Sequence, residues 1–265
     1  MATIISSVTR QGAYEPFELQ VARGQIQAHK TLFKFGNNED INGTSEIIWS
    51  QGGAYTYPSV AAQVKVSSDS ANDTAAGVGA RTIVVSGLDA SYNEISETVT
   101  LNGQTEVLTV NLFIRVFRAF VATAGSGGTA AGVIYVGTGT VTAGVPATVY
   151  ASIPLGANQT QMAMWTVPAG YTLYIYSGNF SAASNNATQY VLGQFFVRSF
   201  GGVFRNVADI TVNSNVFRYE WSIPIAVPEK ADIEARAIAL SGTNFFVTAS
   251  FEGIYIKNDG NAYAS

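Results

Sequence analysis

Short runs rich in Val, Ile, Thr, Phe and Tyr recur along most of the chain, and Gly, Asn, Asp and Pro separate them. Helical periodicity is almost absent, because apolar residues rarely recur at intervals of three and four positions. Short strands at regular spacing, with turn residues between them, are typical of a β-sandwich or a barrel. The pattern therefore predicts an all-β fold.

The clearest strands are predicted in the middle of the chain, at residues 81–86 and 94–101. After the second of these, Asn102-Gly103 offers the two positive φ angles of a type I′ turn, which predicts a hairpin returning through residues 106–110. Within the strand at 94–101, Glu97 falls on the apolar face. A charge on that face predicts a bulge or a sheet edge at this point.

Residues 113–121 carry apolar side chains on both faces, which predicts a central strand that is covered on both sides. The stretch at 232–237 instead alternates Asp, Glu and Arg with Ile and Ala, which predicts a half-buried strand with its charged face in solvent. Strands of a second unit are expected at 162–167, 171–176, 190–199, 203–212, 217–225, 232–240 and 245–256.

The first sixty residues differ, because strand fragments at 17–21, 32–35 and 46–49 alternate with loops rich in Asn and Gly. This part has too few periodic runs to form a core of its own. We therefore predict two antiparallel β-sandwich or jelly-roll-like units with an extended N-terminal arm. The predicted boundaries are 1–60 for the arm, 61–156 for a β-sandwich domain, and 157–265 for a jelly-roll-like β-sandwich domain.

Composition narrows the function classes. Hydrophobic residues make up 47% of the 265 residues, but charged residues make up only 12%, against about 25% in ordinary soluble domains. The surface must therefore be covered by uncharged polar side chains or by neighbouring molecules. With 14 basic and 18 acidic residues the net charge is −4, which argues against nucleic acid as a partner. No run of like charge suggests a membrane-surface patch.

The chain has no cysteine and one histidine, His29, so disulfides, thiolate metal sites and multi-histidine metal sites are excluded. The start lacks a basic leader, and the most apolar run, 112–124, is interrupted by Arg115 and Arg118 and is too short to cross a bilayer. We expect a soluble protein made in a cytoplasm without secretion.

Few residues are candidates for catalysis. His29 stands in no nucleophile-elbow sequence, so a surface or interface position is favoured. The carboxylate pairs Glu94/Glu97 and Asp232/Glu234 could in principle hydrolyse a glycoside, but both lie in alternating strands where charge indicates a wet face. No catalytic residue is assigned.

The sequence also gives little support for a metal or cofactor site. Residues 67–74 contain Asp69, Asn72 and Asp73, but they lack the turn glycine and the bidentate Glu of a calcium loop. An Asx-rich turn is the better interpretation. The glycines at 125–128 and 137–139 lack the Lys and following helix of a phosphate loop. No metal or cofactor residue is assigned.

Two groups of tyrosines could stack on a sugar ring, Tyr55 with Tyr57 and Tyr171 with Tyr174 and Tyr176. A core or an oligomer interface is favoured for both groups. Without a signal peptide, the glycosylation sequons carry no weight. These sequons begin at Asn42, Asn72, Asn158, Asn179 and Asn186.

Several segments together resemble virion structural proteins of tailed bacteriophages, including phages of marine bacteria and cyanobacteria. They are residues 21–36 with Ile48-Trp49, the stretches SDSANDTAAG (68–77) through TVTLNG (98–103), FGGVF (200–204) and PEKADIEARA (228–237). The resemblance implies a non-enzymatic component of the phage particle, located in the virion. Capsid decoration protein, head or tail fibre, and neck or collar protein remain open, with capsid, portal or neck, or tail proteins as partners.

Two hypotheses follow. The first is a structural protein that assembles on the particle as a homo-oligomer, with a trimer among the candidate states, because so few charges favour association. The second is a carbohydrate-binding β-sandwich, such as a receptor-binding tip that contacts a host-surface glycan.

Overall fold

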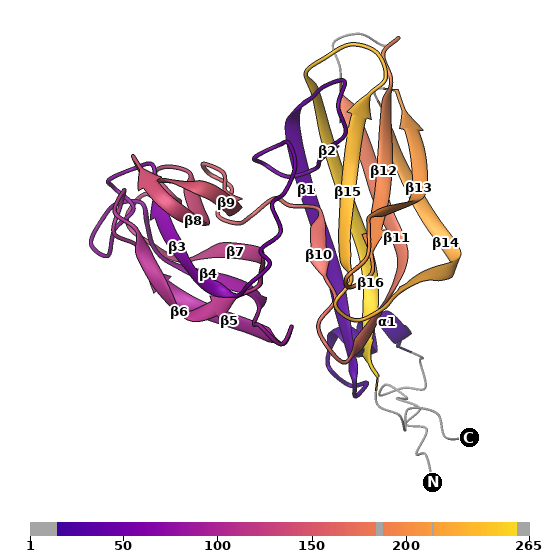
Figure 1. Ribbon diagram of the computed structural model, residues 1–265, viewed down its shortest axis with the longest axis horizontal. Coiled ribbons are helices and arrows are strands. Elements are labelled where there is room, and N and C mark those ends of the chain that lie inside the picture. The colour runs from indigo at the N-terminus through magenta and orange to yellow at the C-terminus, as the bar shows by residue number, and fades with distance from the viewer. Residues whose placement is uncertain (1–14, 184–187, 214, 259–265) are drawn as a thin grey trace.

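The computed structural model describes residues 15–183, 188–213 and 215–258, which form two antiparallel β-sandwiches and one short helix (Figure 1). The predicted all-β class with sandwich units is confirmed. The smaller sandwich stands beside the larger one in Figure 1, and two crossing segments join them.

The small sandwich contains one sheet of four strands and one of three, and its apolar core lies between them. The four-stranded sheet has the order β6 (Val107–Phe113), β3 (Ala62–Ser68), β8 (Ile134–Thr142) and β9 (Val145–Ile153). The three-stranded sheet has the order β5 (Glu94–Thr100), β4 (Ala80–Leu88) and β7 (Arg115–Ala124).

The large sandwich encloses a second core between a four-stranded and a five-stranded sheet. The first has the order β1 (His29–Ile41), β16 (Phe245–Lys257), β11 (Tyr171–Ala183) and β14 (Val216–Val227). The second has the order β10 (Met164–Thr166), β15 (Asp232–Ala239), β12 (Val191–Arg198) and β13 (Arg205–Val212), with β2 (Glu46–Ile47) paired to β15. The small sandwich is thus inserted between β2 and β10 of the large one.

The structure differs from the predicted N-terminal arm over residues 29–41. There β1 pairs antiparallel with β16 along nearly its whole length, from His29 opposite Ile256 to Ile41 opposite Phe245, and it completes the sheet of the large sandwich. The local pattern does not show this because a strand near one end of the chain takes its partner from the other end.

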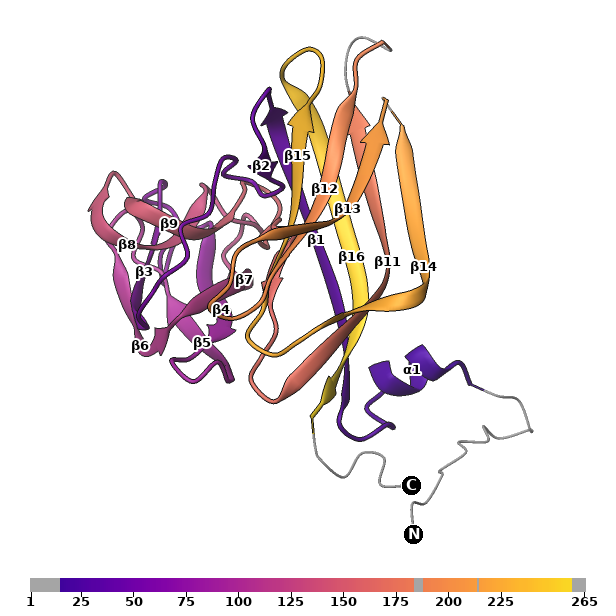
Figure 2. The same cartoon turned by 45° about the vertical axis from the view of Figure 1, so that its right-hand side comes forward.

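The strand fragment predicted at 17–21 is also wrong, because these residues form helix α1 (Phe17–Ala22) at one end of the large sandwich (Figure 2). Pro16 precedes the helix, where its fixed φ and missing N–H cost nothing, and Glu18 lies in the first turn, where the helix dipole favours an acidic residue. Val21 is the buried residue of the helix.

The predicted Asn102-Gly103 hairpin is wrong, since β5 pairs with β4 whereas β6 pairs with β3. The dipeptide carries the chain from one sheet to the other, and only Gly103 of the two has a positive φ. The hairpin with two consecutive positive φ angles connects β8 to β9 at Ala143 (48°) and Gly144 (83°). A Cβ atom on Gly144 would lie 1.9 Å from the Ser68 carbonyl oxygen, so this position requires glycine.

The prediction of one central strand over 113–121 is wrong. The strand is interrupted at Ile114, which separates β6 from β7. β7 lies at the edge of the three-stranded sheet. Its second apolar face is nevertheless covered, because Phe117 packs against the core of the large sandwich, with its ring centre 6.0 Å from that of Trp165. The strands predicted in the second unit are confirmed as β10 to β16. Their ends differ from the prediction by at most two positions, except that β11 ends at Ala183, seven positions later than predicted.

Candidate functional site at the junction of the two sandwiches

A buried ionic network occupies the junction between the two sandwiches. Its centre is β15, where Asp232 is 3% exposed and Glu234 is 1% exposed. The prediction of a solvated charged face for this strand is therefore wrong. The alternation was identified correctly, but the face that carries the charges is turned toward the small sandwich rather than toward water.

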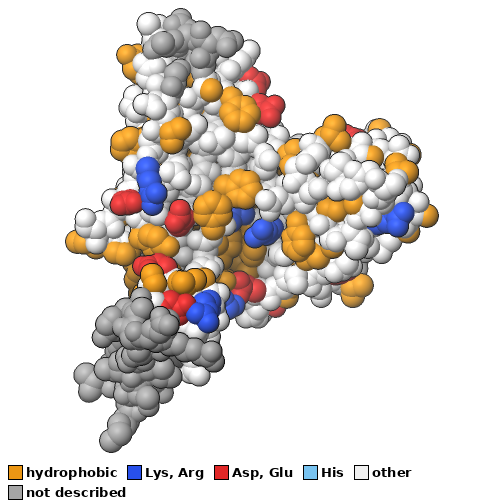
Figure 3. Space-filling view, turned by 180° about the vertical axis from the view of Figure 1, so that it is seen from behind, with side chains coloured by type: hydrophobic (Ala, Val, Ile, Leu, Met, Phe, Trp, Pro, Cys, Tyr) orange, Lys and Arg blue, Asp and Glu red, His pale blue; other side chains and the backbone are white. Residues whose placement is uncertain are grey.

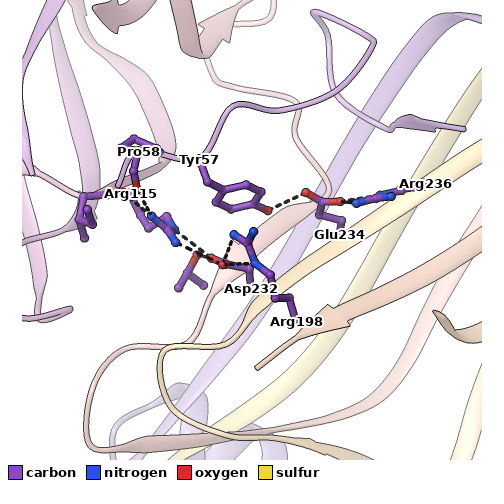
Figure 4. A network of polar contacts seen from close by, with 9 residues as sticks. Tyr57, Pro58, Arg115, Arg198, Asp232, Glu234 and Arg236 are labelled. Carbon is purple, nitrogen blue, oxygen red and sulfur yellow. Dashed lines mark hydrogen bonds and ion pairs between the residues drawn. The ribbon is translucent and has the colours of Figure 1, made fainter. Parts of the chain in front are cut away.

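Asp232 is the hub of this network (Figure 4). Its Oδ1 accepts hydrogen bonds from Arg115 Nε at 2.9 Å and from Thr166 Oγ1 at 2.6 Å. Its Oδ2 accepts from Arg115 Nη2 at 3.2 Å and from Arg198 Nη2 at 2.6 Å. Arg115 comes from β7 of the small sandwich and also donates from Nη1 to the Pro58 carbonyl oxygen at 3.0 Å, so one carboxylate joins both units.

Glu234 forms the second half of the network. Its Oε1 accepts from the Tyr57 hydroxyl at 2.7 Å, and its Oε2 accepts from Arg236 Nε at 2.5 Å. Burial raises the pKa of Glu234, and the neighbouring Arg236 opposes that shift. Burial together with the negative charge of Glu234 raises the pKa of Tyr57 well above its ordinary value, so this hydroxyl keeps its proton and acts as a donor.

Aromatic rings enclose the arginines. The guanidinium of Arg198 lies 4.2 Å from the ring centre of Tyr57 and 4.5 Å from that of Phe204. Arg115 lies 4.8 Å from the Tyr57 ring on the small-sandwich side. Cation–π contacts of this kind strengthen when water is excluded. Every carboxylate in the network already has two or more donors, so the arrangement suits holding two units together rather than transferring a proton.

Two further contacts cross the junction. Lys30 at the start of β1 forms an ion pair with Glu94, whose Oε1 also accepts from the Tyr255 hydroxyl at 2.9 Å. Lys34 is buried and donates to the Phe117 carbonyl oxygen at 2.6 Å. Burial, with a smaller effect of Arg118, lowers the pKa of Lys34 to about 7.

The carboxylates of the other predicted pair point to different places. Glu94 contacts the large sandwich, whereas Glu97 accepts hydrogen bonds from the backbone N–H of Val110 and of Asn111, each at 2.8 Å. The predicted sheet edge at Glu97 is confirmed, since β5 is the outer strand of its sheet. Glu97 spans from this edge to the free edge of β6.

The predicted oxygen-rich turn has a structural role. Asp73 is fully buried and accepts four hydrogen bonds, from the N–H of Ala80, Ala131 and Gly132 and from the Ser68 hydroxyl, at 2.6–3.0 Å. Oxygens that receive N–H and O–H donors are not directed at a cation. In the described part of the chain, no group of three or more His, Cys, Asp or Glu side chains could hold a metal ion.

His29 and the glycine loops also have local partners. The Nδ1 atom of His29 lies 2.7 Å from the Gln27 carbonyl oxygen, and its ring meets Phe17 edge-on at 5.8 Å. At Gly125 a Cβ atom would lie 2.1 Å from the Gly77 carbonyl oxygen, and at Gly137 it would lie 2.1 Å from that of Thr148. Close backbone approach therefore accounts for these two glycines.

The candidate sugar-stacking tyrosines divide into buried and surface groups. Tyr55 and Tyr57 are enclosed at the junction, and Tyr171 packs against Tyr255 with ring centres 5.3 Å apart. Tyr174 is the most exposed of the five, at 36%. Of the sequon asparagines, Asn186 lies outside the described residues, and Asn179 donates to Ser250 Oγ at 3.2 Å.

Apolar side chains remain exposed on edge strands of both sandwiches. On β6 they alternate at Leu108 (51% exposed), Val110 (83%) and Leu112 (50%), and on β14 Ile223 reaches 85%. Figure 3 shows hydrophobic side chains spread over both units on one face of the molecule, among many uncharged atoms and few charged groups. None of the helical segments within the described ranges has the length and apolarity needed to cross a bilayer.

The chain has weak similarity to known proteins. No family model matches the chain, and neither does any curated protein. Solved structures with some similarity include infectious bursal disease virus of the Gx strain (10% identity, 89% of this chain and 73% of that chain, TM-score 0.27). Another is the VP2 subviral particle of the same virus (11% identity, 88% and 73%, TM-score 0.24). TM-scores this low do not establish a common fold.

Proposed function

We propose that this chain is a non-enzymatic structural subunit of a virion that assembles with further copies of itself on the particle. The resemblance to tailed-phage proteins favours a capsid decoration, fibre or neck component, with other virion proteins as neighbours. The observation that carries the proposal is the apolar stripe on β6, which we define as Leu108, Val110 and Leu112.

This β6 stripe is a regular feature of a single strand face. Its three side chains point the same way because positions two apart share a face, and each is at least half exposed. Burying apolar surface contributes roughly 25 cal/mol per Å². An exposed stripe on an edge strand is costly for a lone molecule, but it is well suited to a contact between subunits.

Glu97 limits how that contact forms. Its carboxylate occupies the N–H groups of Val110 and Asn111, so another strand cannot pair with β6 at this point. The side chains of the stripe stay accessible, which favours packing through side chains over open-ended strand addition. A structural subunit has to associate through side chains and not through strand pairing, because unlimited pairing at a sheet edge leads to aggregation.

The ionisable groups support the absence of catalysis in this proposal. The chain has few charges, and two buried carboxylates, Asp232 and Glu234, are engaged by arginines in the junction network. Each accepts hydrogen bonds from two or more donors at the junction, so neither of them is a free acid or base.

The test is the oligomeric state of the full chain, measured by size-exclusion chromatography with light scattering, together with electron micrographs of purified particles. We expect an oligomer that Val110→Asp converts to a folded monomer. Val78→Asp is the matched control, because Val78 is 52% exposed on a loop of the same sandwich and its replacement should leave the oligomer intact. A wild-type monomer that is absent from particles would overturn the proposal.

Carbohydrate binding by the tyrosines is the second candidate. The exposure of Tyr174 is the observation that favours it, because the other four tyrosines are more covered. A glycan array with wild type and Tyr174→Ala tests it. Binding that the variant abolishes would support this surface, and binding that persists would exclude it.

A further inference from the structure

A hollow of ≈ 620 Å³ opens on the outer face of the four-stranded sheet of the large sandwich. Its lining combines aromatic rings with amide and hydroxyl side chains, and none of its ten lining residues is charged. This composition differs from the β6 stripe, which is purely aliphatic, and from the junction network, which is rich in charge.

The strand register explains how the hollow forms. Phe33, Phe35 and Asn37 alternate along β1 and therefore share one face. Ser250 on β16 lies opposite both Phe35 on β1 and Asn179 on β11, so a row of side chains crosses three strands. The row faces outward because the neighbouring residues of β16, at positions 249 and 251, point into the core.

The aromatic part of the hollow is accessible. Phe33 is 56% exposed and Phe246 is 40% exposed. The rings of Phe33 and Phe35 lie 6.0 Å apart with an angle of 32° between them, which makes a broad and nearly continuous apolar surface. Such a surface can accept the C–H face of a saturated six-membered ring.

The polar part offers hydrogen bonds that the chain itself does not use fully. The Oδ1 atom of Asn37 is buried yet has no hydrogen-bond partner among the described residues. The amide of Asn179 makes a long bond of 3.2 Å to Ser250 Oγ. A buried acceptor without a donor is costly, so a ligand hydroxyl that hydrogen-bonds to the Asn37 amide after a small rotation of this side chain would be favoured.

We propose that this hollow, with Phe33 as its stacking surface and Asn37 and Asn179 at its polar wall, binds a neutral pyranose unit of a glycan. A pyranose ring has an apolar C–H face and a rim of hydroxyl groups that both donate and accept. The absence of charge in the lining selects against phosphorylated or acidic sugars, because an unpaired charge is costly to desolvate.

A contact with a second copy of the chain fits the hollow less well. An apolar side chain seated on Phe33 would cover the amides of Asn37 and Asn179 without giving them partners, which costs free energy. The proposal is also independent of the proposed function, because the hollow and the β6 stripe lie on different sandwiches. Val110→Asp tests one surface, and Phe33→Ala tests the other.

The experiment is saturation-transfer NMR on the full chain with methyl glucoside, methyl galactoside and methyl mannoside, and with sialic acid as a charged comparison. We expect at least one neutral glycoside to bind with a Kd on the order of 1–10 mM. Phe33→Ala and Asn179→Ala should each weaken that binding about tenfold or more. Phe217→Ala is the matched control, because Phe217 is 48% exposed on β14 of the same sheet but does not line the hollow, and it should leave binding unchanged. Tyr174→Ala tests the tyrosine surface as the alternative binding site.

Folding of each variant is checked by its thermal midpoint, and Phe33 is exposed enough for its replacement to be tolerated. Three results would overturn the proposal. They are no transfer to any neutral pyranoside, binding that Tyr174→Ala removes and Phe33→Ala does not, and a Phe33→Ala variant whose only change is a smaller oligomer mass. The last result would instead make this face a contact between copies.

Discussion

The guanidinium of Arg115 pairs side-on with the carboxylate of Asp232, at 2.9 Å and 3.2 Å, although the two residues are 117 positions apart in the chain. Arg115 lies at the beginning of β7 in the small sandwich, and Asp232 lies at the beginning of β15 in the large one. A bidentate arginine contact of this kind fixes direction as well as distance. It therefore orients one sandwich against the other.

Removal of the Asp232 carboxylate should be costly. Asp232→Ala leaves Arg115 buried without its counter-ion, and loss of one partner from a buried pair lowers stability by about 3–5 kcal/mol. We expect that drop in the free energy of unfolding from denaturant titration, together with separate transitions for the two sandwiches. Asp209→Ala is the control, because Asp209 lies on the exposed side of β13 and its loss should cost about 0.5 kcal/mol or less. Equal effects of the two variants would show that the network does not join the units.

Lys34 should make stability depend on pH. Burial lowers its pKa to about 7, whereas the unfolded chain keeps the ordinary value of about 10.5. Between these values the unfolded state holds a proton that the folded state has lost, so stability rises with pH. Relative to Lys34→Met, wild type should gain about 2 kcal/mol between pH 7 and pH 9. Parallel pH profiles of the two proteins in denaturant titrations would contradict this prediction.

Glu97 should protect the edge of β6. Glu97→Ala frees the N–H groups of Val110 and Asn111 beside an exposed apolar stripe, which is a template for strand pairing. We expect faster aggregation at constant temperature, followed by static light scattering, with a small loss of stability. Glu106→Ala removes a surface partner of Lys65 and should aggregate at the wild-type rate. If both variants behave alike, general loss of negative charge is the cause.

Asp73 should be a structural anchor of the small sandwich. Asp73→Asn replaces two accepting oxygens with one oxygen and one NH₂ donor, which then faces N–H and O–H groups, and we expect a loss of about 2–4 kcal/mol. Asp69→Asn disturbs a single bond, to the N–H of Val133, and should cost less. Calcium should not shift the thermal midpoint of the wild type, and a rise of several degrees would restore the metal interpretation of this turn.

Local features of the fold followed directly from the sequence. Period-two alternation identified the strand at 232–237, because the pleat sends successive side chains to opposite faces. Recurrent short runs with turn residues between them identified the other strands of the large sandwich, such as 245–256. The misfit of Glu97 on an apolar face indicated a sheet edge, and an edge is where the structure places β5. The scarcity of charge also indicated surfaces that are covered by neighbours or by uncharged groups.

The partner of each strand could not be read in this way. Asn102-Gly103 has the composition of a tight hairpin, yet the flanking strands join different sheets. The apolar second face of β7 suggested a central strand, but its cover is the other sandwich, at Trp165. In each case the missing information is a contact between residues far apart in the chain.

Alternation and turn residues along the chain establish that this protein is built of β-strands with turns between them, and which side chains share each strand face. Contacts between distant segments bury the charged face of β15, with Arg115 and Arg198 around Asp232, and they bring Phe33 and Asn179 to one hollow. The two differ because periodicity shows how a strand divides its side chains between two faces. Which face meets water, and which meets a second sheet, depends on packing between distant segments.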